Sequence, residues 1–136
     1  MNLSGQSAEA SLTVQQSDTA EALRLGDEDS FPAVFATSRM VALMEIAAAR
    51  LMRPLLKEGE LSVGVSIQVS HGAATPVGHR VRAVATYQRL EGKLHRFKVE
   101  AFDDAGSIGS GEHVRAIVGT ERLVAGARRR MEAARD

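Results

Sequence analysis

Glu45, His71 and Thr37 are the residues in this sequence whose types and positions best suit acyl-transfer chemistry. Glu45 lies within an apolar run, and its neighbours three and four positions away are all apolar: Val41, Ala42, Ala48 and Ala49. No basic partner is therefore available on the same helix face. Burying a lone carboxylate is costly, so Glu45 is either paired with an arginine from a strand or catalytic. We favour the catalytic role, because perturbed acids concentrate in active sites.

His71 continues an alternating series of apolar residues: Leu61, Val63, Val65, Ile67 and Val69. The period of two predicts a strand, with this face directed toward the helix that carries Glu45. A histidine there is either a satisfied core residue or a general base, and imidazole suits that work near neutral pH. The expected proximity to Glu45 favours the base.

Thr37 lies where the helical pattern begins. It is an N-cap, or a hydroxyl that attacks a carbonyl or orients a water, and both roles can coexist at a helix N-terminus, which also favours developing negative charge. Gly64 has the opposite strand parity from His71, so we expect a backbone role, either as an oxyanion donor or as a bulge.

Arg115 shares one face of the last predicted strand with His113. It either pairs with Glu45 or contacts a phosphate or carbonyl of a ligand. The four histidines (71, 79, 95 and 113) show no metal-ligand spacing, so we predict no metal. The run 128–130 is three arginines, typical of a solvated helix end, with contact to a nucleotide phosphate as the alternative.

The surrounding pattern predicts an α+β fold in one domain over 1–136, with a core over 6–120 and a C-terminal helix or tail over 121–136. An opening strand is expected over 7–19, and a buried helix from Thr37 that Pro54 ends. Long antiparallel strands follow, separated by turns at Glu91-Gly92 and at 103–106. One buried helix and such strands suggest a sheet wrapped around that helix, with open edges that favour self-association.

Composition excludes several function classes. Basic and acidic residues both number 17, so the broad positive field typical of nucleic-acid binding is absent. Charged residues and a proline interrupt the most apolar segment, 40–56, which argues against a membrane span. The N-terminus lacks the pattern of a secretory signal, and the chain has no cysteine for disulfides or thiolate chemistry. We therefore expect a cytoplasmic protein.

Four segments together resemble the fluoroacetyl-CoA thioesterase family. They are Phe31-Pro32-x-Val34-Phe35-Ala36-Thr37, Met40-Val41-x-Leu43-Met44-Glu45, His71-x-Ala73-Ala74-Thr75-Pro76 and Ile108-Gly109-Ser110-Gly111-x-His113-x-Arg115-Ala116. The resemblance covers roughly 31–118. It implies a hotdog fold, an antiparallel sheet around one long central helix, in a homodimer whose active sites lie at the subunit interface.

The resemblance also implies roles for single residues. Thr37, Glu45 and His71 match the catalytic threonine, glutamate and histidine of the family. Gly64 matches a glycine beside the thioester carbonyl, and Arg115 matches an active-site arginine. Phe31 corresponds to an aromatic that covers the acyl pocket in the fluoroacetyl-specific member. That member has a second aromatic three positions earlier, where this chain has Glu28, so selectivity for fluoroacetate does not carry over.

The expected activity is hydrolysis of a small or short-chain acyl-CoA to free acid and CoA. No cofactor is needed, because CoA is part of the substrate. Two other functions remain open at this point: an enoyl-CoA hydratase-like enzyme, which also uses a histidine with a carboxylate, and a non-catalytic acyl-CoA-binding module.

Overall fold

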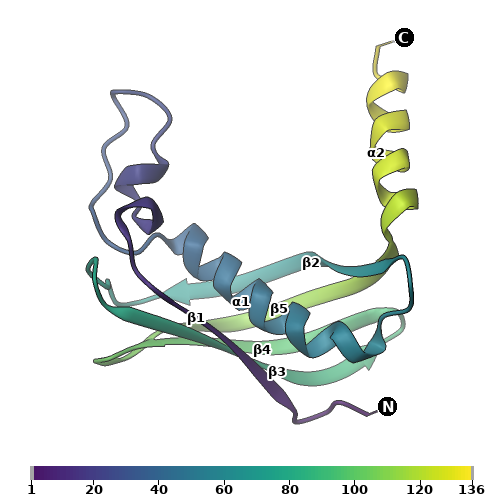
Figure 1. Cartoon of the computed structure of the whole chain (residues 1–136), viewed down its shortest axis with the longest axis horizontal. Coiled ribbons are helices and arrows are strands. Elements are labelled where there is room, and N and C mark those ends of the chain that lie inside the picture. Colours follow the sequence, from purple (N-terminus) through teal and green to yellow (C-terminus); the bar gives the residue numbers. More distant parts are fainter. Residues whose placement is uncertain (1, 136) are drawn as a thin grey trace.

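The computed structural model describes residues 2–135 and has the predicted α+β architecture. Five strands form one antiparallel sheet in the order β1-β3-β4-β5-β2: β1 (Ser7–Thr13), β2 (Glu60–His71), β3 (Arg80–Glu91), β4 (Leu94–Asp103) and β5 (Gly106–Gly119). The sheet curls around helix α1 (Thr37–Met52), which lies across its concave face (Figure 1). β1 and β2 are the two edges of the sheet, so β2 carries an open edge within the chain.

Helix α1 packs one face on the sheet and leaves the other face partly open. Its buried residues recur at helical spacing: Met40, Leu43, Met44, Ala47, Ala48, Leu51 and Met52. They meet small and branched side chains of β3 and β4, among them Val81, Ala83, Ala85, Val99 and Ala101. On the open face, Ile46 is 45% exposed. The prediction of a buried helix is therefore confirmed for the face on the sheet and wrong for the opposite face, because the sheet covers only one side of the helix.

The end of α1 and the later turns agree with the sequence. Pro54 lies in the 3-10 turn η3 (Arg53–Leu55), directly after the helix. Gly92 and Gly106 have positive φ values in the predicted β3–β4 and β4–β5 turns. The opening strand is shorter than predicted, because two 3-10 turns, η1 (Gln16–Asp18) and η2 (Glu21–Leu23), follow β1.

A β-bulge in β2 corrects the predicted strand parity. Gly64 pairs with Arg115, and Ser66 pairs with Val114, so Val65 is an extra residue without a partner. An extra residue moves all following side chains to the other face. Val65 is 53% exposed and Leu61 is 54% exposed, although both belong to the series expected to face the helix.

Helix α2 (Thr120–Ala133) extends away from the sheet, as Figure 1 shows, and none of its residues is buried. Among residues 2–135, no helix combines the length and apolar character needed to cross a membrane.

Candidate functional site

Thr37 is the first residue of α1, and backbone hydrogen bonds to two distant segments hold the residues directly before it. Ala36 is the N-cap, in an extended conformation and without a side-chain cap. Its backbone N–H donates to the Asp18 carbonyl at 3.0 Å, and the Phe35 N–H donates to the Thr75 carbonyl at 2.9 Å. The N-cap interpretation of Thr37 was therefore wrong: the cap position falls one residue earlier, which leaves the Thr37 hydroxyl free for another partner.

That partner is His71, at the end of β2. The Thr37 hydroxyl oxygen lies 2.8 Å from His71 Nδ1. His71 Nε2 is buried and has no hydrogen-bond partner within residues 2–135. Phe35 packs edge-on against the imidazole, with the ring centroids 6.4 Å apart at 80°. The structure thus joins a hydroxyl to a potential base at a helix N-terminus, an arrangement suited to activating a nucleophile.

A cavity of about 350 Å³ opens beside this pair. Its lining comes mainly from the segment before α1 and from the residues after β2: Ala20, Pro32, Val34, Phe35, Ala36, Thr37, His71, Gly72, Ala73 and Ala74. Phe31 is 50% exposed and is not part of this lining. Phe35, which we did not single out, is 1% exposed and forms a wall. Its position two residues before Thr37 was the feature of the sequence that could have identified it as a residue of the site.

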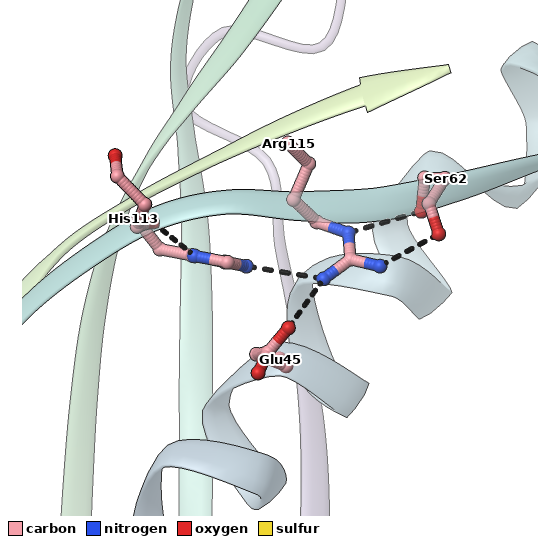
Figure 2. A network of polar contacts seen from close by, with 5 residues as sticks. Glu45, Ser62, His113 and Arg115 are labelled. Carbon is pink, nitrogen blue, oxygen red and sulfur yellow. Dashed lines mark hydrogen bonds and ion pairs between the residues drawn. The ribbon is translucent and has the colours of Figure 1, made fainter. Parts of the chain in front are cut away.

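A second polar cluster lies further along α1, around Arg115 of β5 (Figure 2). Arg115 Nε donates to Ser62 Oγ at 3.0 Å, and Nη2 donates to the Ser62 carbonyl at 2.8 Å. Arg115 Nη1 lies 3.2 Å from Glu45 Oε2 and 3.1 Å from His113 Nε2. Burial lowers the pKa of Arg115, and the Glu45 carboxylate opposes that shift. The guanidinium is thus engaged on every side.

Glu45 is neither unpaired nor fully buried, so the prediction of a lone buried carboxylate was wrong. Its ion pair with Arg115 is the strand-arginine alternative, and 40% of its side chain remains exposed. This pairing was one of the alternatives predicted for both residues, and the ion pair between Glu45 and Arg115 confirms it. The pair leaves Glu45 Oε1 uncommitted in the described part of the chain, so pairing and a chemical role are compatible.

Gly64 allows the Glu45 carboxylate to approach β2. A Cβ atom on Gly64 would lie 2.5 Å from Glu45 Oε2 and 3.3 Å from His113 Cε1. A small cleft of about 160 Å³ opens here, lined by Glu45, Gly64, Val65, Ser66, Ile67 and His113. Because of the bulge, Gly64 and His71 share the face of β2 that meets the helix, contrary to the predicted opposite parity.

The two clusters are separate within one chain. Glu45 lies roughly two turns along α1 from Thr37, about 12 Å at the rise of a helix. Across residues 2–135, no hydrogen bond or ion pair links His71 to Glu45, so the expected meeting of these two side chains does not occur inside the chain. In the same range, no group of three or more acidic or histidine side chains is arranged to hold a metal ion.

Comparison with known proteins relates the chain to thioesterases. Residues 14–121 match the family model described as fluoroacetyl-CoA-specific thioesterase. A fluoroacetyl-CoA thioesterase of Streptantibioticus cattleyicolor is 45% identical over 103 residues, which are 76% of this chain and 74% of the relative.

Solved structures of thioesterases have the same fold as this chain. A phenylalanine-to-alanine mutant of the fluoroacetyl-CoA-specific thioesterase superposes with a TM-score of 0.88 at 37% identity, covering 96% of this chain and 97% of that one. The same mutant in complex with fluoroacetate and CoA gives a TM-score of 0.82 at 38% identity, covering 88% and 98%. A Thermus thermophilus member of the thioesterase superfamily gives 0.86 at 31% identity, covering 97% and 95%.

Proposed function

Because this chain belongs to the fluoroacetyl-CoA-specific thioesterase family and has a hotdog fold, we propose that it hydrolyses small or short-chain acyl-CoA thioesters to free acid and CoA. Thioester hydrolysis is the activity that defines the family. The observation that carries the proposal is the 2.8 Å contact between Thr37 and His71 beside an apolar cavity. A volume of about 350 Å³ can hold a short acyl group.

The chemistry assigned to Thr37 and His71 is attack on the thioester carbonyl. His71 Nδ1 accepts the proton of the Thr37 hydroxyl or of a water that this hydroxyl positions. The new C–O bond forms as the C–S bond breaks, and the CoA thiolate leaves and takes up the proton held by His71. If the Thr37 oxygen is the attacking atom, a water then hydrolyses the acyl ester on Thr37 and releases the free acid. The N-terminus of α1 stabilises the negative charge that develops on the carbonyl oxygen. No cofactor takes part in this scheme.

Glu45, Gly64 and Arg115 complete the proposed site from a second subunit. Glu45 either orients the attacking group or itself attacks to give a transient anhydride, with Gly64 beside the carbonyl. The separation of the two clusters along α1 supports this division, because one chain supplies only half of the constellation. Arg115 acts through Glu45, since its donors already have protein partners.

A homodimer formed through the β2 edge accounts for the apolar surface there. Leu61 and Val65 of β2 and Ile46 of α1 are each 45% or more exposed, along an edge with unpaired backbone groups. Antiparallel pairing of two such edges would satisfy these backbone groups and bring apolar side chains of the two subunits next to one another. We propose that the chain is a single domain over 1–136, with its core over 6–120, and that two copies form this dimer. We also propose a cytoplasmic location.

The acyl group is the open part of the proposal. From the family resemblance we assign Phe31 to the acyl side, and this chain has Glu28 at the position of the second aromatic that the resemblance implies for the fluoroacetyl-specific member. We therefore expect turnover of acetyl-CoA and haloacetyl-CoA without strong preference for fluoroacetyl-CoA.

The first experiment measures thiol release from a panel of acyl-CoAs, from acetyl and haloacetyl to aromatic and long-chain. Turnover should fall by at least about 100-fold in Thr37→Val and in His71→Ala, the size typical for loss of acid–base catalysis. Thr37→Ser serves as the matched control because it keeps the hydroxyl. Conversion of an enoyl-CoA without thiol release would instead identify a hydratase, and tight binding without turnover would identify a binding module.

The composite site has its own test, in which two impaired variants are mixed. Thr37→Val and Glu45→Gln subunits should each retain only low residual activity as homodimers. After unfolding and refolding together, heterodimers contain one intact site, so about a quarter of wild-type activity should return with random pairing. No recovery from a mixture that light scattering shows to be dimeric would contradict a site built from two subunits.

A further inference from the structure

His113 is a buried histidine to which neither the family resemblance nor the proposed mechanism gives a task. It lies on β5 and is 1% exposed, directly between the bulge of β2 and Arg115 (Figure 2). Its Nδ1 lies 2.8 Å from the Ser66 carbonyl oxygen, and its Nε2 lies 3.1 Å from Arg115 Nη1. Both ring nitrogens therefore have hydrogen-bond partners, and each partner determines whether the nitrogen donates or accepts.

The hydrogen-bond partners determine the tautomer. A carbonyl oxygen only accepts, so Nδ1 carries the hydrogen and donates it to Ser66. Burial lowers the pKa of His113, which favours the neutral ring. In the neutral Nδ1–H tautomer, Nε2 holds a lone pair, and Arg115 Nη1 donates to it.

This acceptor controls the direction of the Arg115 guanidinium. Nη1 has two hydrogens, one for His113 Nε2 and one for Glu45 Oε2. Ser62 holds the other side of the group at Nε and Nη2. Without an acceptor at the His113 position, one Nη1 hydrogen loses its partner, and the planar fork can rotate away from the carboxylate.

We propose that His113 is a positioning residue for thioester hydrolysis, which holds Arg115 in the orientation that places the Glu45 carboxylate beside Gly64. Its bond to Ser66 also ties it to the residue after the bulge that brings Gly64 to the helix. The inference rests on the proposed function, in which Glu45 takes part in catalysis. A competing explanation is simple packing, because the ring also lies against Phe97 with the centroids 6.1 Å apart.

Two amide variants separate positioning from packing. The Gln side chain can place its oxygen near Nε2 and keep an acceptor for Arg115, whereas the shorter Asn side chain can reproduce only the Nδ1 donor to Ser66. Both variants leave a similar defect in the aromatic packing. We expect His113→Asn to lower kcat by about 10-fold to 100-fold with little change in KM, and His113→Gln to retain most of the activity.

Combination with Glu45→Gln tests whether His113 acts through the carboxylate. If it does, His113→Asn should cause no further loss in the Glu45→Gln background, because the group that it positions is already gone. Thermal unfolding and light scattering on each variant confirm that the dimers compared are folded. Equal kcat losses in the Asn and Gln variants, or the same loss with and without the Glu45 carboxylate, would overturn the positioning role.

The experiment distinguishes failure of this role from failure of the proposed function. A slow Glu45→Gln variant together with a fully active His113→Asn variant refutes only the role of His113. Full thioesterase activity in Glu45→Gln removes the proposed catalytic role of Glu45, and the positioning role of His113 with it.

Discussion

Replacing Gly64 by alanine tests whether the Glu45 carboxylate must lie where it does. The new Cβ atom would lie 2.5 Å from Glu45 Oε2, so that oxygen must retreat by about 0.9 Å to reach the 3.4 Å of an ordinary van der Waals contact. The carboxylate is the far end of a flexible side chain, and 40% of it is exposed, so it can move. The backbone N–H of residue 64 remains in the variant, which separates the carboxylate's position from any oxyanion role of that N–H.

The expected effect is large on the rate and small on stability. A displacement of about 1 Å in a catalytic group costs roughly 100-fold in rate. The partly exposed ion pair with Arg115 contributes about 0–1 kcal/mol, and alanine gains roughly 0.5–1 kcal/mol over glycine within a strand. These stability terms nearly cancel. We therefore expect kcat in Gly64→Ala to fall about 100-fold, with a thermal midpoint close to that of the wild type.

Thiol release under saturating acyl-CoA measures kcat, and calorimetry measures the midpoint. Gly119→Ala is the matched control, since that glycine lies on β5 opposite the start of β2 and its new Cβ would meet only Arg122, at 3.7 Å or more. The control should keep both the rate and the midpoint. A folded Gly64→Ala dimer with wild-type kcat would refute the requirement for a close carboxylate.

Three further predictions concern stability. Met44 is fully buried, so Met44→Ala should lower the free energy of unfolding by about 2–5 kcal/mol in denaturant titrations, and a smaller loss would indicate that the core collapses into the space. Tyr87→Phe removes the bond from the Tyr87 hydroxyl to His95 Nδ1 at 2.7 Å and should cost roughly 1 kcal/mol while leaving thiol release unchanged; a loss of activity would contradict the assignment of the site. The Thr75 hydroxyl donates to Asp103 at 2.7 Å and is the largest cause that lowers the pKa of Asp103. This stabilisation is present above the unfolded-state pKa of aspartate and is lost as pH falls through the lower folded-state pKa. The loss of unfolding free energy caused by Thr75→Val should therefore be full near pH 7 and shrink below about pH 4. A loss that is constant with pH would refute the charged hydrogen bond.

Local patterns predicted most of the fold. The helical spacing of apolar residues from Met40 to Met52 and the alternation in the later strands depend only on neighbours in the chain, so the helix, its end before Pro54 and the turns at Gly92 and Gly106 were predicted close to where they lie. The sheet-around-helix architecture follows, because a helix with an apolar face needs a sheet to cover it.

Local patterns failed to predict which face of β2 each residue occupies, because one extra residue shifts the pairing register of the strand. Strict alternation placed Leu61 and Val65 toward the helix and Gly64 away from it. The bulge at Val65 reverses this, and no residue within β2 marks it except the glycine itself. The bulge forms because β5 pairs with β2 on both sides of it, a long-range condition that periodicity does not contain.

The sequence by itself determined which side chains are present for chemistry, namely Thr37, Glu45, His71 and Arg115, and that the first of them begins a helix. Only the tertiary structure decided which of them meet. It joins Thr37 to His71 and Glu45 to Arg115, and it keeps the two pairs apart along α1. The physical reason is that contacts between distant segments depend on how strands pair and helices pack, whereas a pattern in the chain records only which face each residue favours.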